Sequence, residues 1–372
     1  MCNHVERLYE ANMADVEVTN LLRLKLVDSL SEINTAIVMG RVLYLLGKSP
    51  SMDDNFFVMI TNHIHRNQLY PAGDSPRLWC RYFKFIGDNR IYHRPLLEVL
   101  AAGFYDYLAD RVESATGPCS RRMQEAVALA SWALAISAPD LALDHLFGLM
   151  LRFVAQPGVD RSVVIRVYWS SAISNRLLEN LDIKDIGRML DETLAGSNVG
   201  PRHKSHLHQI YTTLRCLNMA GIEDKGLTKR CLESLHALRY GYNDSKISTS
   251  QRYVSDVLVR LGVPHRVEVL TPDLLSIDIA IEGDGEQIAL EVDGPLHFIR
   301  VCDGNEDSTP MHTGPTRAKQ TFLRSSGWLV VSAPPVKLDD GDDLASSIAS
   351  VDMYYKKILM NSGSKYLNRL LG

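Results

Sequence analysis

The stretch LLSIDIAIEGDGEQIALEVDGPLHF, residues 274–298, decides the fold of the C-terminal part of the chain. Apolar and polar residues alternate on both sides of the Gly-Asp-Gly segment 283–285, which is typical of two strands joined by a tight turn. One face of this hairpin is expected to hold the apolar residues at alternate positions, namely Ile277, Ile279, Ile281, Ile288, Leu290 and Val292. The other face would then collect three carboxylates, Asp278, Glu291 and Asp293. Such a group is costly unless a metal, a base or water relieves it.

The segments around this hairpin alternate between helical and strand patterns. The order helix, three strands, helix, strand predicts an α/β core of the form α-β-β-β-α-β, in a domain spanning residues 245–372 after a boundary at Asn243-Asp244-Ser245. Besides the hairpin, its expected elements are a helix at 248–261, a strand at 265–270, a helix at 316–325, a strand at 328–332 and a helical stretch from 343 to about 360. A polar loop from Val301 to Met311 separates the hairpin from the second helix.

The residues before this boundary, 1–244, have helical periodicity throughout. Proline, glycine or an N-cap residue separates the runs, at 16–28, 33–47, 55–69, 75–86, 95–114, 120–136, 140–155, 161–180, 183–195, 202–220 and 228–240. Because helices of this length cannot bury their apolar faces alone, we expect them to stack in pairs as an α-solenoid, a degenerate helical repeat. The alternative is an irregular helical bundle. The predicted fold class is mainly α, with the α/β domain at the C-terminal end.

Composition and charge bound the function. The chain has 372 residues, of which 46% are hydrophobic and 23% charged, as in ordinary folded proteins. Residues 246–372 contain 13 Lys and Arg against 17 Asp and Glu, which leaves 27 of each before them and a net charge of −4 overall. Nucleic-acid binding would therefore depend on local basic patches.

Compartment signals are sparse. The six cysteines are scattered without zinc-ligand spacing and are interpreted as reduced thiols. No apolar run approaches the roughly 20 residues of a membrane span, so no membrane partner is expected. The first residues carry Glu6, Glu10, Asp15 and Glu17, which is atypical of an Arg-rich organellar presequence.

The hairpin and the segment after it resemble the RAP domain, a short C-terminal module of many organellar RNA-binding proteins. The resemblance rests on Asp278-Ile279-Ala280, on Glu291 to Phe298 (EVDGPLHF), on Thr313-Gly314-Pro315-Thr316 with Lys319, and on Gly327-Trp328. It implies an RNA-binding protein of a mitochondrion, or alternatively of a plastid, that acts in RNA processing, RNA stability or on ribosomal RNA.

A RAP domain in turn resembles the PD-(D/E)XK nuclease fold, in which an Asp and a (D/E)-x-K pair bind a divalent metal and activate water. Asp278 and Glu291 match the two acids and would be the metal ligands, with Mg²⁺ as the cofactor of an active site. Asp293 stands where the lysine of that motif belongs, and Lys319 could supply the missing cation. If the site were active, its catalytic residues would be Asp278, Glu291, Asp293 and Lys319. We expect instead a vestigial site without cofactor, held by hydrogen bonds to Lys319, Arg317 or His297.

Candidate RNA-binding residues fall into two groups. In the C-terminal domain, an edge of Arg300, Arg317, Lys319 and Arg324 suits phosphate geometry, and His297 would contact a phosphate or orient a carboxylate. In the helical region the densest basic cluster, at a predicted helix start after Gly200-Pro201, is formed by Arg202, His203, Lys204 and His206 together with His208. A metal site of its histidines is disfavoured by their spacing. Further candidates are Arg121 and Arg122, followed by Arg152, Arg161 and Arg166.

The aromatic residues of the helical region allow two interpretations. Trp79, Tyr82, Phe83 and Phe85 lie among Arg77, Arg81 and Lys84, an interleaving that would suit stacking of unpaired bases, although core packing explains it equally well.

The sequence thus favours an organellar RNA-binding protein that contacts ribosomal RNA as a component or assembly factor of a mitochondrial ribosome. Its expected partners are RNA and the other proteins of a ribonucleoprotein particle. A metal-dependent RNA endonuclease or RNA-processing and stability factor, and a protein–protein scaffold, stay open as alternatives.

Overall fold

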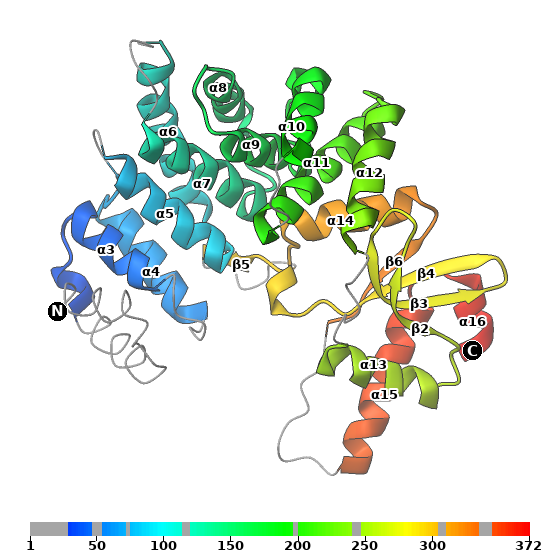
Figure 1. Ribbon diagram of the computed structural model, residues 1–372. Coiled ribbons are helices and arrows are strands. Elements are labelled where there is room, and N and C mark those ends of the chain that lie inside the picture. The colour runs from blue at the N-terminus through cyan, green and yellow to red at the C-terminus, as the bar shows by residue number, and fades with distance from the viewer. Residues whose placement is uncertain are drawn as a thin grey trace. The chain divides into compact units, whose positions relative to one another are not determined.

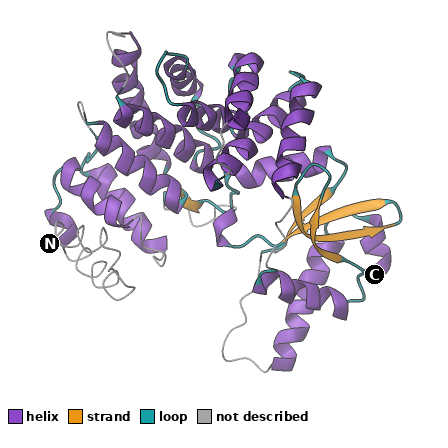
Figure 2. Cartoon of the chain, viewed as in Figure 1, coloured by secondary structure: helices purple, strands orange, loops and turns teal. Residues whose placement is uncertain are grey.

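The computed structural model describes residues 29–46, 54–71, 75–113, 120–195, 200–239, 247–303, 310–334 and 344–372. These residues are mostly helical, with a small sheet in the C-terminal part (Figures 1 and 2). The chain divides into two compact units, which we treat separately. The predicted helix that starts at Val16 and the predicted boundary at 243–245 lie outside the described residues.

The first unit contains the described residues up to Leu227, together with Ile299–Gly314. Its helices lie within a few residues of the predicted ones, and 3-10 turns lie at Leu30–Glu32 and Leu178–Asn180. The helices are α3 (Ala36–Leu46), α4 (Asp54–Arg66), α5 (Pro76–Asn89), α6 (Arg94–Glu113), α7 (Arg121–Ser137), α8 (Asp144–Val154), α9 (Arg161–Ile173), α10 (Ile183–Ala195) and α11 (Pro201–Met219).

Two predicted helix bounds were wrong. The helix predicted to start at Asp140 starts at Asp144, because the Asp140 carboxylate accepts a hydrogen bond of 2.7 Å from the Tyr92 hydroxyl instead. The helix predicted to reach Asn180 ends at Ile173, and Leu177 then takes a left-handed backbone conformation before a separate 3-10 turn. In the first place a hydrogen bond between residues 48 positions apart competes with the apolar pattern, and in the second a turn does.

Helices α3, α5, α7, α9 and α11 pack in sequence as one layer, and α4, α6 and α8 pack in a second one (Figure 1). Within the first layer, neighbouring helices run in the same direction. Cys80 contacts the carbonyl of Arg122 near the start of α5 and α7, whereas Gly87 lies against Trp132 near their ends. This arrangement brings the N-termini of the layer to one edge of the unit.

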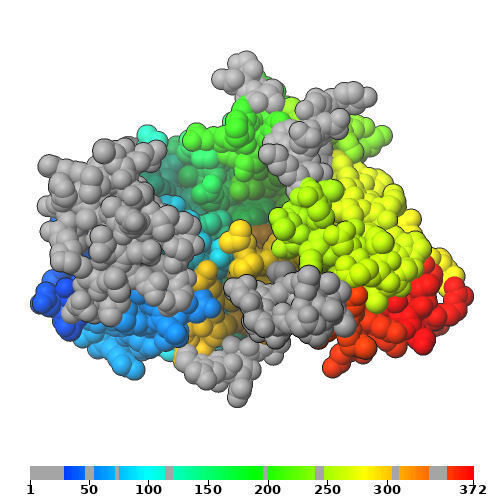
Figure 3. Space-filling model, turned by 90° about the horizontal axis from the view of Figure 1, so that it is seen from below, coloured from blue at the N-terminus to red at the C-terminus, as the bar shows by residue number. Residues whose placement is uncertain are grey.

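The segment Ile299–Gly314 returns from the C-terminal sequence to the helical unit. Strand β5 (Arg300–Val301) pairs in parallel with β1 (Ile91–Tyr92), and Arg300 forms an ion pair of 2.6 Å with Asp54. Figure 3 shows this segment, in gold, beside the blue and cyan residues of the first unit. At its end, Gly314 lies so close to the backbone of α7 that a Cβ atom there would be 2.3 Å from the carbonyl oxygen of Ala135.

The second unit contains the described residues of Thr228–Phe298 and Pro315–Gly372. Its division from the first unit differs from the predicted bounds at 244 and 245, because most of α12 belongs to it and Ile299–Gly314 does not. Its elements are α12 (Lys225–Arg239, which begins in the first unit), α13 (Thr249–Arg260), β2 (Arg266–Leu270), β3 (Ser276–Gly283), β4 (Glu286–Glu291), the 3-10 turn Pro295–His297, α14 (Gly314–Ser325), β6 (Leu329–Ser332), α15 (Leu344–Met360) and α16 (Lys365–Leu371).

The sheet has the order β2-β3-β4-β6. Strands β2, β3 and β4 are antiparallel neighbours, and β6 pairs in parallel with β4 after the crossover through α14. A parallel pair requires such a crossover, so the order helix, three strands, helix, strand agrees with the predicted core. Helix α16 was not predicted.

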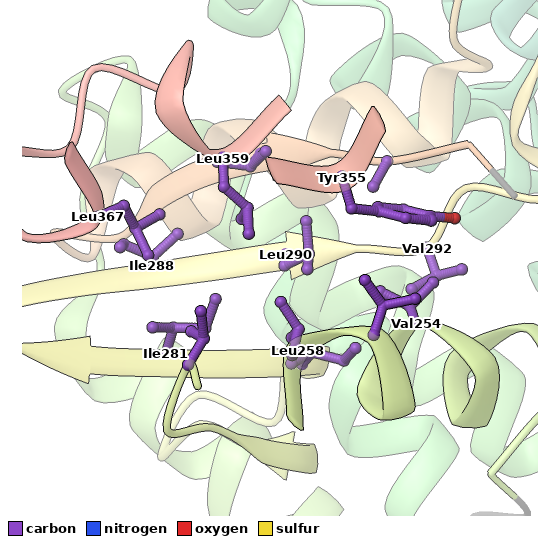
Figure 4. Packing of buried hydrophobic residues seen from close by; sticks show 14 of the residues in the cluster. Val254, Leu258, Ile281, Ile288, Leu290, Val292, Tyr355, Leu359 and Leu367 are labelled. Carbon is purple, nitrogen blue, oxygen red and sulfur yellow. The ribbon is translucent and has the colours of Figure 1, made fainter. Parts of the chain in front are cut away.

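Helices cover both faces of the sheet. On one face, α13, α15 and α16 bury the strand residues Ile279, Ile281, Ile288, Leu290 and Val292 (Figure 4). On the other face, Leu323 of α14 packs against Ile277, Ala280 and Ala289. Placing Ile277 with Ile279 and Ile281 was therefore wrong. The regular strand pairing skips Glu268 and Asp278, and Glu268 has a φ of 54°, which breaks the two-residue alternation at this point.

Candidate nucleic-acid interface and a buried carboxylate cluster

Glu291, at the end of β4, is deeply buried, and only Asp293 is less exposed among the predicted catalytic residues. Its side chain contacts the ammonium group of Lys319 on α14 through Oε2, whereas Oε1 is buried without a hydrogen-bond partner. The pKa of Glu291 is raised to about 7, chiefly by burial, with Lys319 opposing the shift and the charges of Asp278 and Asp293 adding to it. The pair thus holds a carboxyl group that changes charge near neutral pH.

The other two carboxylates of the cluster hold the backbone and neighbouring side chains in place. Asp278 Oδ2 accepts a hydrogen bond of 2.8 Å from the backbone N–H of Val292. Asp293 is 1% exposed and accepts a hydrogen bond from the Ser332 hydroxyl. The Nδ1 atom of His297 lies 3.3 Å from Asp293 Oδ1, so His297 contacts a carboxylate, the second of its two expected roles.

Two residues of this network, Ser332 and Thr316, were not singled out from the sequence. The Thr316 hydroxyl lies 3.3 Å from His297 Nδ1. Ser332 reaches the cluster because β6 pairs with β4 in the register that places it opposite Glu291. The signal that would have found Ser332 is that register, which the parallel crossover sets and local periodicity does not.

The carboxylates that the nuclease resemblance assigns to a divalent metal have protein partners in this structure. In the described part of the chain, no group of three or more His, Cys, Asp or Glu side chains is arranged to hold a metal ion. Asp278 and Asp293 are engaged by the backbone N–H and by Ser332, and Glu291 is engaged by Lys319.

The residues of the predicted basic edge belong to two different units. Arg300 belongs to the first unit, where it pairs with Asp54 and lies over the ring of Phe57. Lys319 contacts the buried Glu291, and its side chain is 26% exposed. Arg317 is half-buried, and Arg324 is exposed on the last turn of α14. Arg300 is therefore not part of the α/β unit that contains Arg317, Lys319 and Arg324, because Ile299–Gly314 belongs to the first unit.

The basic cluster around Arg202 does form in the first unit, and it is wider than the sequence run. Arg161 and Arg166 of α9 act electrostatically on Arg202 and His206 of α11. We call these four residues the arginine cluster. Burial lowers the pKa of Arg166, and the charge of Arg202 lowers it further. Burial also lowers the pKa of His206, and Arg161, Arg202 and Arg166 add to this effect, so its imidazole is neutral at pH 7.

Acidic partners for the arginine cluster are scarce. Glu192 lies 3.9 Å from Arg161, and Asp160 caps its own helix by accepting a hydrogen bond from the Ser162 N–H. Among the described residues, neither Arg166 nor Arg202 has an ion-pair partner. Two guanidinium groups that repel each other, one of them half-buried, form a place where a bound anion would be strongly favoured.

The other candidates of the helical unit differ in exposure. His203 and Lys204 are half-buried, and His208 is exposed. Arg121 and Arg122 are exposed at the start of α7, where Arg122 pairs with Glu125 at 3.2 Å. Arg152 is exposed in the last turn of α8.

The aromatic residues of α5 form part of the core, so their alternative role in base stacking was wrong. Trp79, Tyr82, Phe83 and Phe85 are all at most 2% exposed. Trp79 and Phe83 stack with their ring centroids 5.9 Å apart, and Phe104 packs edge-on against both. Their periodicity in α5 marks the buried face of an amphipathic helix.

A scan against protein-family models finds no match for this chain, and no curated protein matches its sequence. Among the described residues, no helix combines the length and the apolar character that crossing a membrane requires.

Proposed function

We propose that this protein binds RNA through the arginine cluster of α9 and α11. The observation that carries the proposal is that α9 and α11 pack against each other and that the charge of Arg202 acts on Arg166 across this contact, with no acidic partner of either arginine among the described residues. Guanidinium groups match the geometry of phosphate oxygens, and an RNA phosphate would replace their mutual repulsion with charge-assisted hydrogen bonds. Phosphate contacts of this kind position a nucleic acid without reading its sequence.

In the same proposal, the α/β unit is a RAP domain and the helical unit is a degenerate helical repeat. Two features support it. The α/β unit has the strand order β2-β3-β4-β6 with a crossover through α14. In the helical unit, helices pack against the second helix after them, as α5 does against α7 and α7 against α9. By the RAP resemblance, the protein works in a mitochondrion, with a plastid as the alternative, and contacts ribosomal RNA as a component or assembly factor of the ribosome.

Neutralising Arg202 separates binding from folding. We expect Arg202→Gln to weaken binding of a structured ribosomal RNA fragment about tenfold and to reduce the salt dependence of log K. The free energy of unfolding should be unchanged or slightly higher, because the substitution removes a repulsion with Arg166. Fluorescence anisotropy and urea unfolding measure the two quantities.

The control for Arg202→Gln is Arg188→Gln, on α10, whose side chain is 69% exposed and pairs with Asp185. It should leave RNA affinity at the wild-type value. Equal affinities of wild type and Arg202→Gln, or a wild-type protein that does not bind RNA, would contradict the proposal.

Sedimentation of the native protein from an organelle extract tests the proposed assembly. We expect the protein to migrate with a ribosomal subunit and to shift to lighter fractions after ribonuclease treatment, with ribosomal RNA enriched in the associated RNA. A light, ribonuclease-sensitive particle that carries a few transcripts would instead identify a processing or stability factor. Migration that ribonuclease does not change would identify a protein-only scaffold.

A further inference from the structure

Arginine recurs in the first turn of four successive helices of the layer formed by α3, α5, α7, α9 and α11. Helices α5, α7, α9 and α11 begin with Pro76-Arg77, Arg121-Arg122, Arg161 and Pro201-Arg202, and the first turn of each contains no acidic residue. We call Arg77, Arg121, Arg161 and Arg202 the arginine row. Helix α3 begins without a basic residue, so the row starts at α5.

The contacts between these helices place the four arginines along one edge. Cys80 of α5 contacts the carbonyl of Arg122, and the Gln124 side chain of α7 hydrogen-bonds to the backbone of Gly158 and Asp160, just before α9. Arg161 in turn acts electrostatically on His206 of α11. Because packed helices lie about 8–10 Å apart, the three intervals from α5 to α11 span roughly 25–30 Å.

At the opposite edge of the unit, three helices begin with an acid, and each of these acids pairs with an arginine. Helices α4, α6 and α8 of the second layer start at this edge, as does α10, because each of them follows the end of a first-layer helix. The first turns of α4, α8 and α10 hold Asp54, Asp144 and Asp185, and the last turns of α5, α7, α9 and α11 hold no basic residue. Arg94, at the start of α6, is the exception, and it pairs with Glu98 at 2.9 Å.

This distribution opposes what helix stability alone would favour. The N-terminal end of a helix carries a partial positive charge, so a cation in the first turn is unfavourable and an acid is favourable. Helices α4, α8 and α10 follow that rule, α6 does not, and the arginine row breaks it four times. Of the row, Arg161 has Glu192 at 3.9 Å, whereas Arg77, Arg121 and Arg202 have no ion pair in the part of the chain that the structure describes. A bound polyanion would reverse the sign of all these interactions.

We infer that an extended single strand of RNA lies along the arginine row and is held through its phosphates. This inference rests on the proposed RNA binding and adds the path and strandedness of the ligand. A linear edge of 25–30 Å suits several consecutive phosphates, within the site sizes of about 4–16 nucleotides that single-strand binders cover. Because the aromatic residues of α5 are buried, the row offers no stacking platform, and binding should be independent of base identity.

The test measures binding of 12-nucleotide and 4-nucleotide oligouridylate by fluorescence anisotropy at several salt concentrations, with the full chain. Wild type should bind the 12-mer at least tenfold more tightly than the 4-mer. In the double variant Arg77→Glu, Arg121→Glu, the affinity for the 12-mer should fall close to the affinity for the 4-mer. The slope of log K against log salt concentration should decrease in magnitude by about 0.7 for each phosphate contact removed. An oligoadenylate 12-mer should bind as the oligouridylate does.

Stability and a matched variant make the test decisive. Both substitutions put an acid in the first turn of a helix, so the free energy of unfolding should not fall, and lost binding would not reflect unfolding. Arg94→Glu changes the same residue type in the first turn of a helix at the opposite edge and should leave binding unchanged. If the Arg77→Glu, Arg121→Glu protein bound the 12-mer as tightly as wild type does, the inference that RNA lies along the arginine row would be refuted. If Arg202→Gln still weakened RNA binding in that case, the proposed function would stand, whereas a wild type that binds no RNA would refute both.

Discussion

Replacing Lys319 with methionine is expected to lower the free energy of unfolding by about 3–5 kcal/mol at pH 8, the usual cost of removing one partner from a buried ion pair. Glu291 is 2% exposed, Lys319 is the cation that contacts it, and its second oxygen is already buried without a partner. Lys319 lowers the pKa of Glu291, so without it the buried carboxyl group must either stay charged in an apolar setting or take up a proton, and the cost of taking up a proton grows with pH.

The pH dependence of this loss identifies its cause. Folding raises the pKa of Glu291 from its ordinary value of about 4.3 to about 7. The stability that protonation of Glu291 contributes is therefore fully present at a pH below about 4.3, and it is lost as the pH rises through 7. At pH 5.5 the carboxyl group is mostly protonated in the folded protein. The Lys319→Met loss should therefore be clearly smaller at pH 5.5 than at pH 8.

Urea unfolding at pH 5.5 and at pH 8 measures the stability loss of Lys319→Met at each pH. The matched control is Arg324→Met, on the exposed face of the same helix, which should change stability by less than about 0.5 kcal/mol. Adding Glu291→Gln to Lys319→Met should recover part of the loss at pH 8, because no buried charge is left. Equal losses at both pH values would show that the lysine contributes through packing and would contradict the buried-charge account.

Gly314→Ala is expected to cost about 1–3 kcal/mol, the range for forcing extra volume into a packed site. The added methyl group would lie 2.3 Å from the carbonyl oxygen of Ala135, and a backbone atom cannot move aside as a flexible side chain can. The close approach explains why a glycine stands at this position of the Thr-Gly-Pro-Thr motif. It lies where the returning segment Ile299–Gly314 ends against α7.

A second motif glycine supplies the control. Gly294 has φ −68° and ψ 174°, an extended conformation that any residue adopts, and no atom lies within 4 Å of where its Cβ would be. Gly294→Ala should be neutral or slightly stabilising, since alanine restricts the unfolded chain more than glycine does. Comparing the urea midpoints of the two variants measures the difference, and equal midpoints would contradict the steric account of Gly314.

RNA binding and the path of the RNA depend on different observations, although the path also requires that the protein binds RNA. RNA binding depends on the charge of Arg202 acting on Arg166, whereas the path of the RNA depends on the first turns of α5, α7, α9 and α11. The carboxylate cluster enters neither proposal. Its hydrogen bonds describe a structural core of the α/β unit in which one carboxyl group titrates near neutral pH.

Local patterns in the sequence determined where the helices and strands lie. The alternation around Gly283-Asp284-Gly285 predicted β3, β4 and their turn, because side chains on a half-buried strand repeat every two residues. The helical runs were located within a few residues, since an amphipathic helix must keep its apolar residues 3 to 4 positions apart. The crowding of Asp278, Glu291 and Asp293 followed from the same periodicity, and their charges do act on one another.

Only the tertiary structure decided which distant residues meet. In the structure, Arg300 belongs to the helical unit and Lys319 forms an ion pair with Glu291. Ile277 lies on the sheet face that α14 covers, and the aromatic residues of α5 are buried. The tertiary structure also placed Arg166 within the electrostatic reach of Arg202 and packed side by side the four helices that begin with arginines. The reason is that periodicity specifies which side of an element is apolar, whereas the neighbour that covers this side depends on strand register, crossovers and helix packing, which are properties of the whole chain.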